Sequence, residues 1–138
     1  MVIFLTGYMA RFSKRLKPDK WAQMSGLKFE TQIVNWLKAQ GYIHVKRTEY
    51  FDRGIDIVAV KDGFIYGIQV KRSAKDVGVA AVRSAVAGLA VYGCHRAMVI
   101  SNANFTRSAI ALANANNCLL VNGSKLESTV YAKEIQKT

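Results

Sequence analysis

The chain has 138 residues, of which 51% are hydrophobic and 21% charged, so it can form one domain with a buried core and is not an intrinsically disordered protein. Lys and Arg number 20 against 9 Asp and Glu, and the net charge of +11 predicts a polyanionic partner, nucleic acid first and an anionic membrane surface second. Cys94 and Cys118 stand in apolar surroundings without CxxC spacing, which indicates reduced, packed thiols of a cytoplasmic protein rather than a disulfide framework.

The first ten residues, MVIFLTGYMA, are apolar but too short to span a bilayer. Basic residues follow this stretch instead of preceding it, unlike those of a signal peptide, so we expect no membrane partner. Residues 11–20, RFSKRLKPDK, hold five basic residues and the only proline, as either a solvated connector or a nucleic-acid-binding arm does. We therefore predict a basic N-terminal extension over residues 1–24 and a single folded domain over residues 25–138.

The first half of that domain predicts one helix followed by three strands. Apolar residues recur at helical spacing between Ser25 and Gln40, and Gly41 provides a C-terminal stop. Residues 43–50 are a probable strand. Residues 55–60 and 64–70 are clearer strands, separated by Asp62 and Gly63.

The second half predicts helices alternating with strands. A helix rich in small residues follows Asp76 and ends near Gly93, and the later elements are a strand over 97–101, a helix over 105–115 and a strand over 118–121. Ser124 and Glu127 have the spacing of a capping box and predict a last short helix. Strands joined by crossover helices pair in parallel, so an antiparallel start is followed by a parallel end. The predicted fold class is α/β, a mixed β-sheet with helices on both faces.

The pair Asp62-Gly63 between apolar runs is a strong signal for a two-residue hairpin turn. With these two residues at the turn, Lys61 pairs with Phe64 and Asp56 falls opposite Gln69. Lys71 shares the face of Gln69 and lies diagonal to Asp56, so the three polar groups converge unless a bulge shifts the register.

A carboxylate beside an amide oxygen is the kind of hard-oxygen site that Mg²⁺ prefers. A neighbouring ammonium, here that of Lys71, can orient or deprotonate a water molecule or stabilise charge on a phosphate. A plain cross-strand salt bridge between Asp56 and Lys71 is the competing interpretation. Glu30 lies next to the apolar Phe29 at the edge of the helix's apolar face, so it either joins Asp56 at the sheet or stays on the exposed helix surface.

The order of these motifs resembles the Mrr-like restriction endonuclease branch of the PD-(D/E)xK nuclease superfamily. The matching residues are Gly26 with Phe29-Glu30, then Gly54-Ile55-Asp56, then Gln69-Val70-Lys71. SNANFTRSAIALA at residues 101–113 and VNGSKL at residues 121–126 are similar to the family's later strand, helix and closing turn. The chain departs from the wider superfamily at Ile55, which replaces a proline, and at Gln69, which replaces a second acidic residue.

The resemblance implies a restriction-endonuclease-like mixed sheet and metal-dependent hydrolysis of phosphodiester bonds in DNA. It implies that Asp56, the Gln69 side chain and the Val70 carbonyl hold Mg²⁺ (or Mn²⁺ in its place), with Glu30 direct or through water. It further implies that Lys71 positions the attacking water. A neutral amide at position 69 contributes less to metal affinity than a carboxylate would, so we expect Glu30 to contribute more to metal binding in this chain.

Basic residues around this site are candidates for DNA phosphates, with solvated surface as the alternative: Arg53, Arg72, Lys75 and Arg83. A single unit of this size cuts two strands most readily as a homodimer. Two alternatives stay open. One is a Holliday-junction resolvase-like nuclease, and the other is a non-catalytic DNA-binding module on the same fold.

Other polar and aromatic residues are given structural roles. Asn102, Asn104 and Thr106 precede a helix and are expected to cap it. Trp21, Tyr50 and Tyr66 are expected to pack in the core or at an interface rather than stack on bases. Asp52 is either a secondary acid near the metal or a turn residue, and His44 and His95 have no spacing typical of a metal site or a triad.

Overall fold

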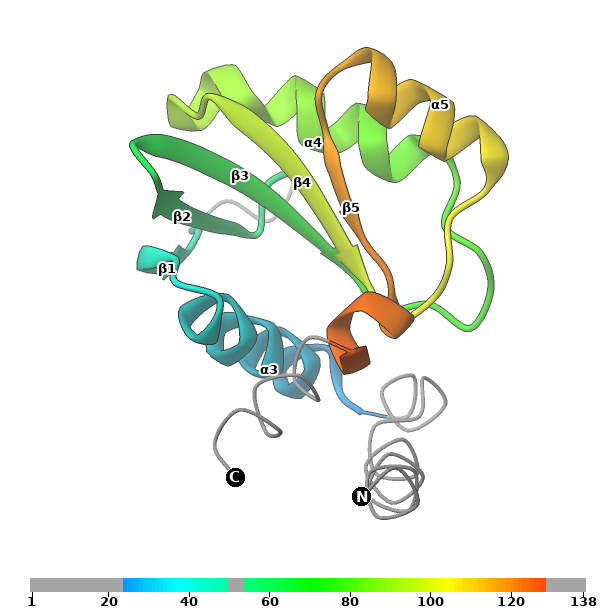
Figure 1. Cartoon of the computed structure of the whole chain (residues 1–138), viewed down its shortest axis with the longest axis horizontal. Coiled ribbons are helices and arrows are strands. Elements are labelled where there is room, and N and C mark those ends of the chain that lie inside the picture. The colour runs from blue at the N-terminus through cyan, green and yellow to red at the C-terminus, as the bar shows by residue number, and fades with distance from the viewer. Residues whose placement is uncertain (1–23, 50–53, 129–138) are drawn as a thin grey trace, which may run out of the picture.

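The computed structural model describes residues 24–49 and 54–128, which form five strands and three long helices (Figure 1). The predicted extension over residues 1–24, apart from Met24, lies outside the described residues. In chain order the elements are α3 (Gly26–Ala39), β1 (Ile43–Arg47), β2 (Ile57–Lys61), β3 (Phe64–Lys71), α4 (Val79–Tyr92), β4 (Arg96–Ser101), α5 (Arg107–Ala115) and β5 (Leu119–Val121).

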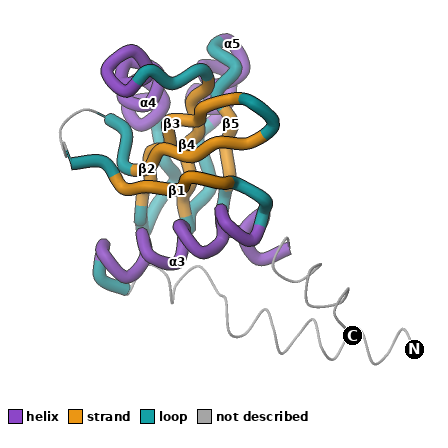
Figure 2. Tube along the Cα trace, turned by 90° about the vertical axis from the view of Figure 1, so that its left-hand side faces the viewer, coloured by secondary structure: helices purple, strands orange, loops and turns teal. Residues whose placement is uncertain are grey.

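The strands form one sheet in the order β1-β2-β3-β4-β5. The pairs β1-β2 and β2-β3 are antiparallel, whereas β3-β4 and β4-β5 are parallel. Helix α3 covers one face of the sheet, and α4 and α5 cover the other, so the molecule has three layers (Figure 2). The predicted mixed sheet with helices on both faces is confirmed.

The two faces of the sheet are packed by different kinds of residue. Large side chains of α3, namely Phe29, Ile33 and Leu37, are buried against Ile57 and Ile68 of the sheet. On the opposite face, α4 and α5 bury mainly small residues, which let the helices approach the strands closely (Ala81, Val82, Ala85, Gly88, Ala109 and Ala113). The helix that carries Glu30 therefore packs on the sheet through larger buried side chains than α4 and α5 do.

The tight turn of the β2-β3 hairpin matches its prediction. Asp62 has φ 52° and Gly63 has φ 80°, both in the left-handed region that a type I′ turn requires. Lys61 pairs with Phe64, and the pairing continues without a shift to Ile57 and Ile68. The predicted register of the hairpin is confirmed over these five pairs.

Several element boundaries differ from the prediction. Strand β1 ends at Arg47, β2 begins two residues late at Ile57, and α5 begins after Thr106, whose hydroxyl accepts a hydrogen bond from Ala109 N. The last helix is not capped by Ser124. Asn122 Oδ1 accepts from Lys125 N, and residues 123–128 are helical, because the side chain of Asn122 reaches the first turn and Ser124 already lies within it.

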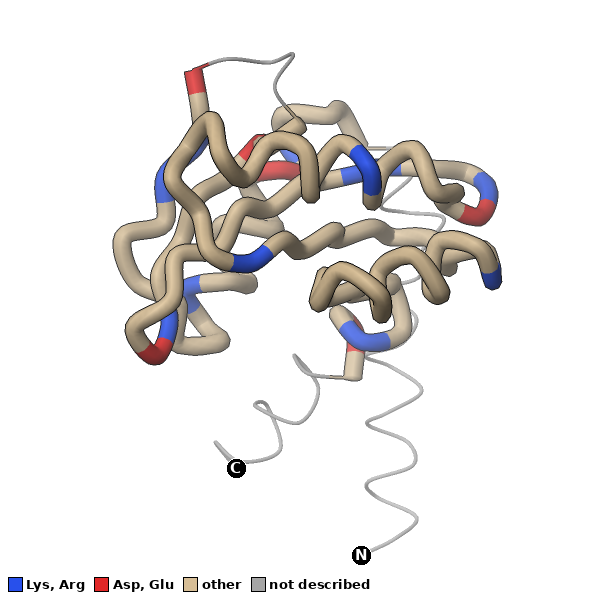
Figure 3. Tube along the Cα trace, turned by 90° about the horizontal axis from the view of Figure 1, so that it is seen from above, with Lys and Arg blue, Asp and Glu red and all other residues tan. Residues whose placement is uncertain are grey.

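Lys and Arg residues are spread over strands, helices and loops (Figure 3). The described residues include no helix long and apolar enough to cross a membrane. Both cysteines are free, and burial raises the pKa of the Cys118 thiol to about 11, so the thiol stays protonated at neutral pH. Tyr66 is buried in the core as predicted.

Candidate active site

The candidate site lies where β2 and β3 stop pairing regularly. Beyond the pair Ile57–Ile68, a regular ladder would bring the Ile55 carbonyl to the N–H of Val70. Instead, Asp56 Oδ2 accepts from Val70 N at 2.7 Å, and Asp56 N donates to Ile68 O at 2.8 Å. The carboxylate of Asp56 thus takes the place of a main-chain acceptor, which fixes its position at the margin of the sheet.

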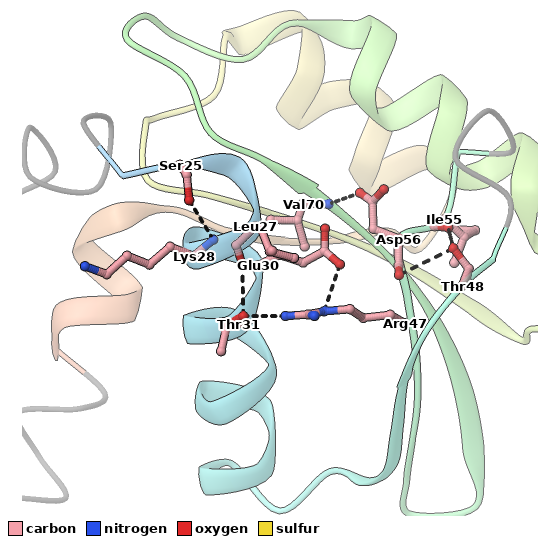
Figure 4. A network of polar contacts seen from close by, with 10 residues as sticks. All are labelled: Ser25, Leu27, Lys28, Glu30, Thr31, Arg47, Thr48, Ile55, Asp56 and Val70. Carbon is pink, nitrogen blue, oxygen red and sulfur yellow. Dashed lines mark hydrogen bonds and ion pairs between the residues drawn. The ribbon is translucent and has the colours of Figure 1, made fainter.

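Thr48 satisfies the main-chain groups that this irregularity releases. Its hydroxyl donates to Ile55 O at 2.6 Å, and its N–H donates to Asp56 O at 2.9 Å. Figure 4 draws the two contacts of the hydroxyl, with Ile55 O and, at 3.4 Å, with Asp56 O. Because a buried carbonyl without a donor is costly, Thr48 stabilises the bend that turns Asp56 towards Val70.

Gly54 brings the chain to this bend. Its φ is +79°, and a Cβ atom at this position would lie 2.1 Å from the carbonyl oxygen of Ser84 in α4. Only glycine allows the loop to approach the helix backbone so closely. The approach to Asp56 is therefore set by contact with α4.

Glu30 reaches the sheet from α3, as one of its two predicted positions requires. Its side chain is 27% exposed and extends towards Val70 and Arg47, with the Asp56 carboxylate beside Val70 (Figure 4). The charge of Asp56 acts on Glu30, because it raises the pKa of the Glu30 carboxyl. Glu30 is thus partly buried and turned towards the sheet, and its role at the site stays a prediction.

Burial and proximity act on both carboxyls. Burial is the largest cause that raises the pKa of Asp56, and the Val70 N–H and the Lys71 ammonium oppose it. Burial also raises the pKa of Glu30, followed by repulsion from Asp56, while Arg47 lowers it. Two partly buried carboxylates that repel each other are stabilised by a cation placed between them.

Gln69, the residue before Val70, also has a buried polar atom. Its Oε1 is buried and has no hydrogen-bond partner within the described part of the chain. A buried amide oxygen is normally paired, and an unpaired one calls for an explanation such as a bound ion. No group of three His, Cys, Asp or Glu residues that could hold a metal occurs in residues 24–49 and 54–128. The candidate oxygen donors named from the sequence are instead the carboxylates of Glu30 and Asp56 and the amide of Gln69.

Lys71 ends β3 next to Ser101 of β4 and is exposed. Its ammonium lowers the pKa of Asp56, so the two groups are near each other. In the residues that the structure describes, Lys71 and Asp56 do not form the plain salt bridge considered from the sequence. The ammonium thus lies close to the carboxylate without being tied to it.

Three of the four basic residues predicted to contact DNA lie in the described part of the chain. Arg72, Lys75 and Arg83 are all exposed. Arg72 directly follows Lys71, and Lys75 follows three residues after Arg72. Arg83 precedes Ser84, whose carbonyl lies against Gly54. Arg53, like Asp52, Tyr50 and Trp21, lies outside the described residues.

Sequence reasoning missed three residues that support the site. Thr48 and Arg47 were assigned only to a strand, and Asn102 was expected to cap a helix. Instead, both amide atoms of Asn102, which is 3% exposed, bond to the backbone of Ser73 at 2.7 Å. This clamp extends the β3-β4 pairing past Lys71. The polar run Lys46-Arg47-Thr48 at the end of a strand was the one signal available for the first two residues.

The raised carboxyl pKa values predict how stability depends on pH. An acid whose pKa is higher in the folded chain than in the unfolded chain adds stability that is fully present below the unfolded pKa and is lost as pH rises through the folded pKa. Asp56→Asn keeps an acceptor for Val70 N–H but cannot ionise. We expect urea unfolding to show wild type losing stability relative to Asp56→Asn as the pH rises above the ordinary pKa of an aspartate. A difference that stays constant as the pH rises would contradict the raised pKa.

The Mrr_cat family model, described as a restriction endonuclease, matches residues 21–130. No curated protein matched the sequence. The crystal structure of the protein of unknown function AF1548 is similar with TM-score 0.59 and 20% identity, over 67% of this chain and 55% of that one.

Two restriction endonucleases have similar structures. The DNA modification-dependent restriction endonuclease AspBHI gives TM-score 0.62 and 11% identity, over 94% of this chain and 35% of that one. MspJI restriction endonuclease, in complex with a 27-mer oligonucleotide, gives TM-score 0.55 and 15% identity, over 92% of this chain and 31% of that one. The chain therefore spans about half of the first structure and about a third of the other two, and these likenesses support the restriction-endonuclease-like fold.

Proposed function

The chain belongs to the restriction endonuclease family described by the Mrr_cat model, and from that premise we propose that it is a metal-dependent DNA endonuclease. One observation carries the proposal. Glu30 and Asp56 act on each other electrostatically from different elements, the Lys71 ammonium acts on Asp56, and Gln69, the residue before Val70, has a buried Oε1 without a hydrogen-bond partner in the described chain. Buried amide oxygens are normally paired, and a bound cation would supply the partner that Gln69 Oε1 lacks in the described chain.

The metal proposed for this site is Mg²⁺, with Mn²⁺ as a substitute. Asp56, the Gln69 side chain, the Val70 carbonyl and Glu30 would hold it. When bound, the ion would supply electrophilic stabilisation of the phosphate and lower the pKa of a water molecule. The residues fit because their donors are all hard oxygen atoms.

The protein residues divide the remaining tasks. Val70 N–H keeps the Asp56 carboxylate ionised and oriented, because a hydrogen bond to the charged form favours it. Lys71 positions the attacking water and offsets the negative charge that develops on the phosphate. Its exposed ammonium, which is not ion-paired to Asp56 in the described chain, is available for both roles.

DNA is the proposed partner. Arg72, Lys75 and Arg83 are exposed near the site, and they would bind backbone phosphates without reading the sequence. Arg53 is proposed for the same role. A homodimer would let two such sites cut both strands of a duplex.

The proposal is tested by titrating Mg²⁺ in nuclease assays on linear duplex, four-way junction and flap DNA. We expect cleavage that depends on Mg²⁺, is lost in EDTA and returns with Mn²⁺. Cleavage confined to the junction would favour the resolvase-like alternative. Salt-sensitive DNA binding without cleavage at any Mg²⁺ concentration would leave the binding module, and would overturn the enzyme.

Lys71→Ala should lower kcat about 10²- to 10³-fold, because the group acts on the developing charge. Arg72→Ala removes the same charge from the next residue and should instead raise KM and reduce the salt dependence of binding. Single-turnover cleavage at saturating and limiting enzyme separates the two effects. Equal loss of kcat in both variants would argue against a specific role for Lys71.

A further inference from the structure

One of the proposed metal-site residues, Glu30, is ion-paired to a residue that the proposed chemistry does not use. Arg47 Nε lies 3.1 Å from Glu30 Oε1. An Nη2 atom of the same guanidinium donates to Thr31 Oγ1, and that hydroxyl donates to Leu27 O at 2.9 Å. The guanidinium therefore joins two consecutive residues of α3, and one of them is anchored to the helix backbone (Figure 4).

An irregularity of β1 places Arg47 on this face of the sheet. Ile43 pairs with Val60, but Lys46 pairs with Val58 and Arg47 with Ile57, so β1 contains one extra residue between these pairs. His44 takes a φ of 51° in this bulge. With unbroken alternation, Arg47 would lie on the face of Ile43, whereas the bulge puts it opposite Ile57, on the face that α3 covers.

Stability does not account for this arrangement. The Arg47 and Glu30 side chains are 39% and 27% exposed, and an ion pair in such surroundings contributes little to the free energy of folding. Geometry is a better explanation. A glutamate side chain has three rotatable torsions, and the planar guanidinium fork fixes both distance and direction in a way that a point charge cannot.

Asp56 adds a reason why Glu30 needs such support. The two carboxylates act on each other electrostatically, and without a counter-charge their repulsion would turn the Glu30 head group away from the sheet. Arg47 supplies this counter-charge through its contact with Glu30 Oε1. It holds the carboxylate by one oxygen and leaves the other outside the ion pair.

We propose that Arg47 is a positioning residue that holds Glu30 at the site through the Arg47–Glu30–Thr31 contacts. The inference rests on the proposed function, because it concerns the metal that this function needs. A positioning role and a purely electrostatic role of Arg47 predict opposite effects of its removal on cation binding. Loss of a nearby positive charge alone would strengthen cation binding, whereas loss of Glu30's orientation would weaken it.

The test measures Mn²⁺ binding without DNA, by following the EPR signal of free Mn²⁺ as protein is added. Arg47→Gln removes the charge, and Arg47→Lys keeps the charge but loses the fork. Both should weaken Mn²⁺ binding roughly 10-fold, the size expected for a residue that orients a ligand. Lys46→Gln is the matched control, since it makes the same charge change one residue away on the opposite face and should leave binding unchanged.

A double-mutant cycle shows whether Arg47 acts through Glu30. In a Glu30→Gln background, Arg47→Lys should have no further effect on Mn²⁺ binding. Thr31→Val removes the second contact of the guanidinium at an exposed helix position and should give a smaller loss than Arg47→Gln. Far-UV circular dichroism and thermal unfolding of each variant confirm that the chain is folded.

The outcomes separate the inference from the proposed function. If Asp56→Asn abolishes Mn²⁺ binding while both Arg47 variants bind like wild type, the inference fails and the proposed function stands. Tighter binding by Arg47→Gln with unchanged binding by Arg47→Lys leaves only an electrostatic role, which also overturns it. If wild type binds no Mn²⁺ and cleaves no DNA in Mg²⁺, the proposed function fails and the inference falls with it.

Discussion

Asp56→Asn should abolish DNA cleavage while leaving the chain folded. Asparagine keeps an oxygen at the position that accepts from Val70 N–H, so the bend between β2 and β3 is retained. It removes the negative charge that the proposed metal requires. Because charge stabilisation in a water-poor site is the largest single contribution to many enzymatic rates, we expect a loss of at least about 10³-fold. The removal of a partly buried charge should leave the free energy of unfolding at neutral pH equal or higher.

The measurement is single-turnover cleavage of a labelled duplex, with thermal unfolding of the same preparation. Asp62→Asn makes the identical substitution at the tip of the hairpin, where asparagine accepts the left-handed conformation as well as aspartate does. This control should retain wild-type activity. Residual cleavage by Asp56→Asn within 10-fold of wild type would remove Asp56 from the proposed site.

Gly54→Ala should destabilise the chain by roughly 3 kcal/mol, and reduce activity with it. The positive φ of +79° costs an alanine about 1 kcal/mol. The new Cβ would also lie 2.1 Å from Ser84 O and 2.7 Å from its carbonyl carbon, and overpacking of this kind costs typically about 1–3 kcal/mol. Because backbone cannot rotate away as a flexible side chain can, the loop or α4 must move, and Asp56 is only two residues distant.

Gly63→Ala separates the two contributions. Gly63 has nearly the same φ, +80°, but an added Cβ there meets nothing within 4 Å. This control should lose only about 1 kcal/mol in urea denaturation and should keep its nuclease activity. If the two alanine variants are equally stable, the contact of Gly54 with α4 does not position the loop.

The hairpin was the part of the site that sequence predicted best. Its register follows from two residues, Asp62 and Gly63, whose conformational preferences are local, and it holds to the pair Ile57–Ile68. The prediction that Asp56 stands directly opposite Gln69 goes one pair too far. At Asp56 the ladder gives way to a side-chain contact with Val70 N–H, because a carboxylate competes with the Ile55 carbonyl for the same donor.

Non-local contacts account for the features that the sequence did not reveal. The β1 bulge depends on how His44 and its neighbours pair with β2, which no spacing within β1 indicates. Asn102 precedes a helix in the sequence, so capping was the natural expectation, yet its amide matches the two backbone groups of Ser73 on the adjacent segment. In both cases a partner distant in sequence determines the role of a polar residue.

Val70 joins the proposed chemistry to the core. Its N–H donates to the Asp56 carboxylate, while its side chain packs against the buried cluster that includes Phe29 and Ile33 of α3. A library randomised at codon 70 and screened for cleavage should therefore return mainly isoleucine and leucine beside valine, as if selected for packing volume. Proline should be missing for a different reason, since it lacks the amide hydrogen that Asp56 receives.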